Sequence, residues 1–139
     1  MKAIFAAGGT AGHINPALAI ADRLKSVFPD AQILFIGTPS GMESRLVTKA
    51  GYEFCHMEVT GFQRKITPEN IGRNIITVKN LLTAGAKSKK ILKDFKPDIV
   101  IGCGGYVSGP IVLQAAKMGI KTATHEQNAF PGVTTKTLC

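Results

Sequence analysis

Two glycine-rich segments of the chain could bind phosphate groups. Residues 8–13 (GGTAGH) and residues 102–106 (GCGGY) each follow a short apolar run. Glycines between a strand and a helix let backbone N–H groups approach a phosphate closely, and the helix N-terminus adds partial positive charge. Two such loops facing one crevice could hold a diphosphate; the plainer alternative is that the glycines only permit tight turns. Tyr106 could place its ring in that crevice or pack in the core.

Both loops differ from the familiar nucleotide-binding motifs. The first is not G-x-G-x-x-G, and no Lys-Ser or Lys-Thr pair follows it as in a P-loop. The apolar run of residues 32–36 ends in Gly37-Thr38, where a dinucleotide-binding domain has an acid for the ribose. These differences argue against NAD and ATP, and we expect no cofactor and no metal in this chain.

Ionisable and amide side chains accompany the glycines. His13 could accept the proton of an attacking hydroxyl, donate a hydrogen bond to a diphosphate, or only cap a helix. Glu126, in the polar segment 125–128, could orient that histidine or take the proton itself. Its structural alternative is a carboxylate satisfied by backbone N–H groups. Gln127 and Asn128 suit hydrogen bonding to a sugar or phosphate, or a structural turn.

The elements that must position these residues follow from the apolar pattern. Short runs typical of strands alternate with stretches of helical spacing; the run at residues 2–7 is typical of a buried strand, and the others lie at residues 32–36, 53–59, 98–102 and 121–124. This alternation predicts an α/β fold, a Rossmann-like parallel sheet with helices on both faces, in a single domain over residues 1–139. Ligands of such sheets gather beyond the carboxyl ends of the strands, where all three polar loops fall.

Capping residues predict where the helices begin and end. Asn15 is the expected N-cap of the first helix, with Pro16 as its first residue. Ser40 and Glu43 have the spacing of a capping box that opens a second helix, which runs to Ala50. The remaining helices are expected over residues 67–96, as one helix or as two broken near Gly85, over residues 108–118, and from residue 134 onwards.

The net charge of +8 is concentrated in one stretch. Between Phe62 and Lys96, nine basic residues stand against two acidic ones. Such a stretch implies an anionic partner, and its lack of interleaved aromatic residues argues against nucleic acid. Apolar residues at helical spacing beside these cations are typical of a helix at a membrane interface; alternatively, the apolar stripe packs on the sheet and the lysines are solvated.

The remaining composition favours a cytoplasmic protein. Three widely spaced cysteines suggest neither a zinc site nor a disulfide framework, which fits a reducing compartment. The first residues run directly into a strand, unlike a signal peptide. No apolar run approaches the roughly 20 residues needed to span a bilayer.

Four segments together resemble the MurG family, the UDP-N-acetylglucosamine:N-acetylmuramyl-(pentapeptide) pyrophosphoryl-undecaprenol N-acetylglucosamine transferases. They are residues 8–21 (GGTAGHINPALAIA), 37–47 (GTPSGMESRLV), 104–110 (GGYVSGP) and 125–132 (HEQNAFPG). They occur in the family's order and cover essentially the whole chain. Ala11 stands where the family usually has glycine, and Thr135 where it usually has asparagine.

The resemblance implies the N-terminal, acceptor-binding half of a two-domain GT-B glycosyltransferase. The C-terminal domain, absent from this chain, would bind most of the co-substrate UDP-N-acetylglucosamine, so the fragment alone would be inactive. The implied reaction is an inverting transfer of N-acetylglucosamine to lipid I, the undecaprenyl-diphosphate-linked N-acetylmuramyl-pentapeptide, at the cytoplasmic face of the bacterial cell membrane. The alternative is a stand-alone, non-catalytic module that binds polyprenyl diphosphates.

Specific roles follow for the residues singled out above. His13 and Glu126 are the predicted catalytic residues. The predicted diphosphate-binding residues are Gly9, Thr10, Ala11, Gly12, Gly104, Gly105 and Tyr106. Those predicted to bind the rest of the substrate are Asn15, Gln127 and Asn128. The predicted contacts with an anionic membrane surface are Phe62, Lys65, Ile71, Arg73, Ile75 and Lys79.

Overall fold

A five-stranded parallel sheet forms the centre of the molecule. The computed structural model describes residues 1–59, 83–128 and 133–138. The strands are β1 (Lys2–Ala6), β2 (Gln32–Gly37), β3 (Glu53–His56), β4 (Ile99–Gly102) and β5 (Lys121–Thr124). Their order across the sheet is β3-β2-β1-β4-β5, and every pairing is parallel. The predicted parallel α/β sheet is therefore confirmed, although the third strand ends at His56 rather than at residue 59.

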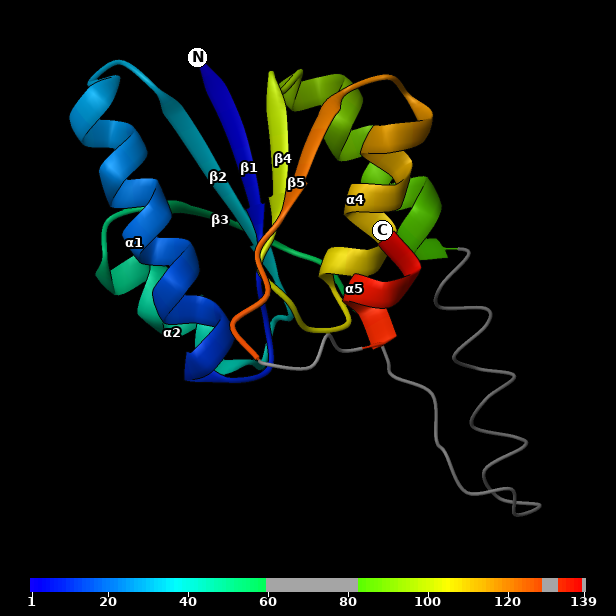
Figure 1. Cartoon of the computed structure of the whole chain (residues 1–139), viewed down its shortest axis with the longest axis horizontal. Coiled ribbons are helices and arrows are strands. Elements are labelled where there is room, and N and C mark those ends of the chain that lie inside the picture. Colours follow the sequence, from blue (N-terminus) through cyan, green and yellow to red (C-terminus); the bar gives the residue numbers. More distant parts are fainter. Residues whose placement is uncertain (60–82, 129–132, 139) are drawn as a thin grey trace.

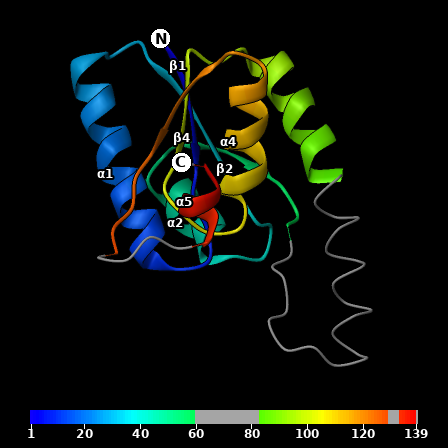
Figure 2. The same cartoon turned by 45° about the vertical axis from the view of Figure 1, so that its right-hand side comes forward.

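Helices cover both faces of this sheet. Figure 1 shows α1 (Ala11–Val27) and α2 (Met42–Lys49) on one side of the strands, with α4 (Ser108–Lys117) and the helical residues 83–95 on the other. The view in Figure 2, turned by 45°, keeps α1 and α4 apart on either side of the strands. A short helix, α5 (Val133–Leu138), ends the described part of the chain. Residues 83–95 are helical throughout, so the break suggested near Gly85 is absent from them.

The apolar runs of the central strands β1, β2 and β4 are nearly continuous because these strands are buried on both faces, whereas β5 is exposed along its length. Along β1, Phe5 packs into the cluster that contains Ile14 and Val47 of α1 and α2. Its neighbour Ile4 belongs to the opposite cluster, with Ile111 of α4. Successive side chains of a strand point to opposite faces, so a single strand supplies both cores.

The first helix begins earlier than its sequence suggests. Thr10 is its N-cap, with extended φ and ψ of −142° and 156°, and the amide N–H groups of His13 and Ile14 donate to the Thr10 carbonyl. The prediction of Asn15 as N-cap was therefore wrong. Ile14 is fully buried and extends the helix's apolar stripe upstream, while Pro16 in the second turn removes a single i→i−4 hydrogen bond.

The second helix also departs from its predicted cap. It begins at Met42 with Gly41 as N-cap, and no side chain caps it. Ser40 and Glu43 thus do not form a capping box. Glu43 is instead fully buried, and its carboxylate turns away from the helix end towards Thr38 and Gly9.

Candidate functional site

The strand order places the two glycine loops beside each other. β1 and β4 are hydrogen-bonded neighbours, with Ala6 opposite Gly102 at their carboxyl ends. From β1 the chain proceeds towards β2 and β3 on one side, and from β4 it proceeds to β5 on the other. Such a switch point opens a crevice beyond the carboxyl ends of the strands, because the two connections diverge to opposite faces. In Figure 1 this edge is the lower rim, where α1 begins.

The two loops touch through backbone atoms that only glycine allows to meet. Gly105 has a φ of +83°, and a Cβ built on it would lie 2.9 Å from the carbonyl carbon of Gly8. Gly104 has a φ of +103°, and its Cβ would lie 2.8 Å from Nε2 of His13. The amide of Gly8 donates to the Gly104 carbonyl at 3.3 Å. The two turns therefore converge on one point of the rim, which is the geometry that a shared diphosphate requires.

The backbone amides of the first loop divide into two groups. Those of Gly8 and Gly9 are engaged, the first by the Gly104 carbonyl and the second by Oε2 of Glu43 at 3.4 Å. The amides of residues 10–12 donate to no acceptor within the described parts of the chain. These three amides lie at the N-terminus of α1, where the helix dipole adds positive potential. An anion is therefore expected to bind beside residues 10–12 rather than at Gly9.

The second loop offers a similar set of donors in the turn just before α4. Its hydrogen bonds hold the turn closed: Ser108 donates to the Gly105 carbonyl from both its amide (3.3 Å) and its hydroxyl (2.8 Å). Among the described residues, the amides of Gly104, Gly105 and Tyr106 have no acceptor. The Tyr106 side chain is 60% exposed, so it does not pack in the core.

His13 links the two loops. Its ring is half-buried and packs over Gly104, and its Nδ1 lies 3.2 Å from the Thr10 hydroxyl oxygen. In the tautomer whose Nδ1–H donates to Thr10, the Nε2 atom keeps a lone pair that can accept a proton. In the other tautomer, Nε2–H is a donor that can bind a phosphate oxygen. Both predicted roles for His13 are compatible with this position.

The third polar loop follows β5 and is fastened to the same rim. The amide of His125 donates to the Gly102 carbonyl at 2.8 Å. The Glu126 carboxylate accepts hydrogen bonds from the amide and the side chain of Asn128, at 3.1 and 2.8 Å, and from the Thr135 hydroxyl at 2.6 Å. None of these bonds involves His13. Thr135 thus makes a polar contact at the position where the resemblance left its role open.

Two buried polar atoms in this loop lack partners within the described residues. They are Nδ1 of His125 and Oε1 of Gln127. Buried polar atoms are nearly always hydrogen-bonded in folded proteins.

Asn128 is exposed, as is Asn15 in the second turn of α1. The predicted substrate-binding residues therefore lie on the surface or at the half-buried edge of the rim.

Glu43 is a site residue that sequence reasoning missed. Its Oε1 accepts the Thr38 amide at 2.9 Å and the Thr38 hydroxyl at 2.6 Å, while its Oε2 accepts the Gly9 amide. Burial raises the pKa of this carboxyl, but these hydrogen bonds outweigh burial, so its pKa lies below the ordinary value. The sequence signal that could have revealed it is helical spacing. Glu43 lies four residues before the apolar Val47, and both are buried on one face of α2.

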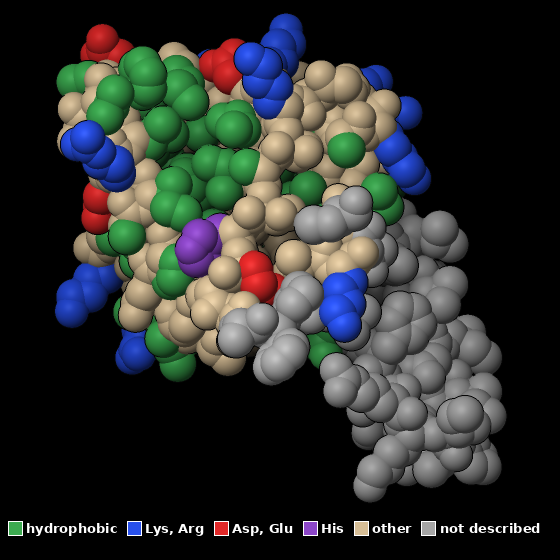
Figure 3. Space-filling view, viewed as in Figure 1, with side chains coloured by type: hydrophobic (Ala, Val, Ile, Leu, Met, Phe, Trp, Pro, Cys, Tyr) green, Lys and Arg blue, Asp and Glu red, His purple; other side chains and the backbone are tan. Residues whose placement is uncertain are grey.

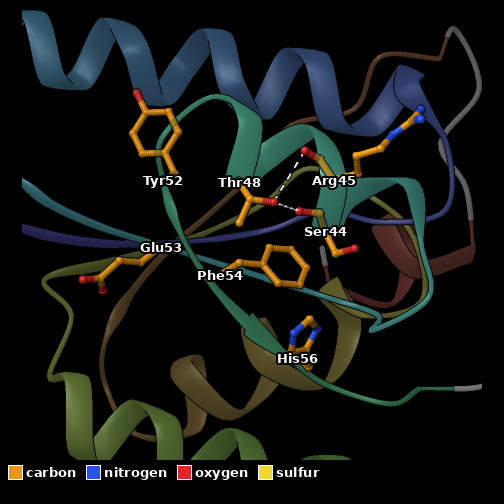
Figure 4. Close-up of a pocket in the computed structure, with 7 residues that line it drawn as sticks. All are labelled: Ser44, Arg45, Thr48, Tyr52, Glu53, Phe54 and His56. Atoms are coloured by element: carbon orange, nitrogen blue, oxygen red, sulfur yellow. Dashed lines mark hydrogen bonds between the residues drawn. The ribbon is translucent and has the colours of Figure 1, made fainter.

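A separate shallow pocket of about 430 Å³ lies between α2 and the edge strand β3. Figure 4 shows Phe54 and His56 side by side along β3, with Thr48 above them on α2 and the Arg45 side chain directed away from them. The Tyr52 hydroxyl donates to Asp22 of α1 at 2.5 Å. No residue of the three polar loops lines this pocket, so it is distinct from the rim.

The predicted membrane contacts, from Phe62 to Lys79, lie outside the described residues. The described remainder of the basic stretch is the helix over residues 83–95. Its Ala84, Ser88 and Leu92 are buried against the sheet, which confirms the sheet-packing alternative for this part. The lysines of its outer face are exposed, and Figure 3 shows basic side chains projecting around the upper right of the molecule, where this helix lies. One of them, Lys90, pairs with Asp94 at 2.7 Å.

Neither a metal centre nor a membrane span is found in the part of the chain that the structure describes. Within residues 1–59, 83–128 and 133–138, His, Cys, Asp and Glu nowhere gather in a group of three that could hold a metal ion. None of the described helices is long and apolar enough to cross a bilayer.

Comparison with known proteins identifies the family of this chain. Residues 3–139 match the glycosyltransferase family 28 N-terminal domain. The chain is 52% identical over 138 residues to a transferase of Acetivibrio thermocellus and 49% identical to one of Alkaliphilus oremlandii. Both relatives are named UDP-N-acetylglucosamine–N-acetylmuramyl-(pentapeptide) pyrophosphoryl-undecaprenol N-acetylglucosamine transferase. The resemblance to the MurG family is thereby confirmed.

The similarity covers nearly all of this chain but only part of its relatives. It spans 99% of the chain, and 36% and 37% of the two transferases. The crystal structure of MurG from Acinetobacter baumannii superposes with a TM-score of 0.81 at 33% identity, over 99% of this chain and 38% of that one. The fold is thus that of the N-terminal half of a GT-B glycosyltransferase.

Proposed function

This chain belongs to the glycosyltransferase family 28 N-terminal domains, and we propose on that premise that it is the acceptor-binding part of an inverting N-acetylglucosaminyltransferase. The acceptor would be an N-acetylmuramyl-pentapeptide joined through a diphosphate to undecaprenol, as in the names of the relatives. The donor, UDP-N-acetylglucosamine, would be held mainly by a second domain corresponding to the rest of the relatives' length. The chain itself would need no cofactor.

The observation that carries this proposal is the meeting of two amide-lined turns at one point of the rim. The free amides of residues 10–12 lie at the start of α1, and those of residues 104–106 lie in the turn just before α4. A diphosphate has two anionic groups a few ångströms apart, so each turn can hold one of them. Helix N-termini bind such groups without a cationic side chain, which fits a loop that lacks a P-loop lysine.

His13 is placed to take part in the chemistry of the transfer. An acceptor hydroxyl must lose its proton as it attacks the donor sugar, and a neutral imidazole nitrogen can accept that proton. The Thr10 hydroxyl would hold Nδ1 while Nε2 takes the proton. Glu126 has both carboxylate oxygens engaged by Asn128 and Thr135, so we assign it the shaping of the third loop in preference to proton transfer.

The third loop and α1 would contact the sugar and peptide parts of the acceptor. Oε1 of Gln127 is a buried acceptor without a described partner, and a sugar hydroxyl is a donor that could pair with it. Asn128 in the third loop and Asn15 in the second turn of α1 are both exposed amides.

An anionic membrane surface is the proposed location of the acceptor's lipid. The helix over residues 83–95 presents its lysines outward, and each cation near an anionic leaflet contributes about 1 kcal/mol. The binding would be peripheral and sensitive to salt. Flotation with liposomes that contain or lack anionic lipid tests this step: equal recovery with both compositions would rule it out.

The diphosphate site can be tested with short polyprenyl diphosphates in solution. Isothermal calorimetry should detect binding of the diphosphate, and much weaker binding of the monophosphate of the same alcohol, because one of the two turns is then left empty. A Gly105→Val variant should lose this preference, and His13→Ala should keep most of the binding while abolishing transfer in a full-length enzyme. Unchanged affinity in Gly105→Val would contradict the proposal. A stand-alone binding module would bind in the same way, but its full-length protein would lack transferase activity.

A further inference from the structure

Three glycines enclose the buried side chain of Glu43. They are Gly8 of the first loop, Gly37 at the end of β2, and Gly41 before α2. A Cβ on Gly8 would lie 2.9 Å from Oε1 of Glu43, and Cβ atoms on the other two would also collide with this side chain. The carboxylate therefore occupies a space formed between the first glycine loop and the carboxyl end of β2.

This space has a known use in related folds. In dinucleotide-binding Rossmann domains, the region between the glycine loop and the end of the second strand receives a ribose, held by an acidic residue. Here β2 ends in Gly37-Thr38, and the carboxylate that enters the region comes from α2. Its oxygens face protein donors instead of ligand hydroxyls. Glu43 thus fills the region that receives the ribose in those domains.

We propose that Glu43 is the positioning residue of the first glycine loop: held by Thr38, its carboxylate fixes the Gly9 amide and thereby aims the free amides of residues 10–12 at the ligand. The inference rests on the proposed function, since the ligand is taken to be the acceptor diphosphate. Glu43 itself is fully buried, so it would act on the ligand through the backbone of the loop.

The chemistry of the three donors explains why a carboxylate stands here. The amide and hydroxyl of Thr38 and the amide of Gly9 all donate to Glu43. An ionised carboxylate has only acceptor sites and can satisfy all three, whereas a glutamine presents an NH₂ group to one of them. The same negative charge repels an anion that would otherwise settle at Gly9. Anchoring and repulsion both direct a phosphate towards the start of α1.

The experiment compares Glu43→Gln with Ser40→Ala, a matched control two residues before α2 begins. Backbone amide resonances of Gly9 and residues 10–13 are measured by NMR in each folded variant. Inorganic pyrophosphate serves as the probe of affinity. We expect Glu43→Gln to shift these resonances and to weaken pyrophosphate binding about tenfold, as expected for loss of a charged hydrogen bond. Ser40→Ala should change neither.

A kinetic readout in a full-length transferase separates positioning from general stability. Glu43→Gln should raise the KM for the lipid acceptor about tenfold and leave the KM for UDP-N-acetylglucosamine unchanged. Thr38→Val removes only the hydroxyl donor, so it should shift the Gly9 resonance in the same direction by a smaller amount. This variant replaces Glu43→Gln in the NMR test if Glu43→Gln does not fold. Amide resonances of residues 9–13 that match the wild type in a folded Glu43→Gln or Thr38→Val would overturn the inference.

Failure of the proposed function would look different. If the wild-type protein bound neither pyrophosphate nor a polyprenyl diphosphate, the diphosphate site would be wrong. The amide resonances of Glu43→Gln would still report whether the carboxylate positions the loop.

Discussion

Replacing Gly105 with alanine would measure how much the fold depends on contact between the two glycine loops. Gly105 has a φ of +83°, a conformation that is strained for any residue with a Cβ. The new Cβ would lie 2.9 Å from the carbonyl carbon and 3.1 Å from the nitrogen of Gly8. Both neighbours are backbone atoms in a loop fastened to Gly104 and Glu43. The loops must therefore move apart.

Gly51 provides a control matched in conformation. It directly follows the C-cap of α2 and has the same φ of +83°. A Cβ on Gly51 would meet nothing within 4 Å. Gly51→Ala should cost only the backbone strain, roughly 1 kcal/mol. Gly105→Ala should cost that strain plus about 2 kcal/mol for overlap in a packed region, about 3 kcal/mol in total. The difference between the two variants isolates the contact between the loops, because the effect of alanine on the unfolded chain is shared.

Urea unfolding at equilibrium gives both free energies, and pyrophosphate titration gives the functional consequence. Gly105→Ala should bind pyrophosphate at least tenfold more weakly than wild type, whereas Gly51→Ala should bind it equally well. Equal destabilisation by the two substitutions, together with unchanged pyrophosphate affinity in Gly105→Ala, would refute the convergence of the loops.

Three further predictions follow from the ionisable groups. The pKa of Glu43 lies below its ordinary value of 4.5, so its contribution to stability is present above pH 4.5 and is lost as the pH falls through the lower, folded-state pKa. Urea unfolding should therefore show Glu43→Gln about 2 kcal/mol less stable than wild type at neutral pH, with a gap that narrows in acid; a constant gap would contradict this. Burial and the hydrogen bond to Asp22 raise the pKa of Tyr52 to about 12, and ultraviolet titration of Asp22→Asn should show that pKa falling towards 10. Burial raises the pKa of the Cys103 thiol to about 11, so mass spectrometry after alkylation at neutral pH should find Cys103 unmodified until the protein unfolds, and rapid modification in the native state would argue against its burial.

The parallel sheet and its three polar loops could be predicted from the sequence. The short strand-like runs that precede Gly8, Gly102 and His125 are local patterns, and parallel strands necessarily bring their carboxyl ends to one edge. The helix ends at Gly51 and Gly119 were predictable for the same reason, since both glycines adopt the positive φ that ends a helix. These features depend on neighbours along the chain.

The start of α1 and the role of Glu43 were decided by the tertiary structure. Locally, Asn15 followed by Pro16 is a good helix start, but burial of Ile14 against the sheet outweighs that preference and extends the helix to Ala11. Ser40 and Glu43 match a capping box, yet the carboxylate gains more from Thr38 and Gly9.

The sequence by itself determined the alternation of strands and helices and the glycine content of the turns. The tertiary structure alone decided which turns meet and which backbone amides remain without an acceptor. The pairing of β4 with β1 placed Gly105 against Gly8, which lies 97 residues earlier in the chain. The reason is physical: backbone preference and amphipathic period act over a few residues, whereas a hydrogen bond such as that from Gly9 to Glu43 exists only after distant segments have packed.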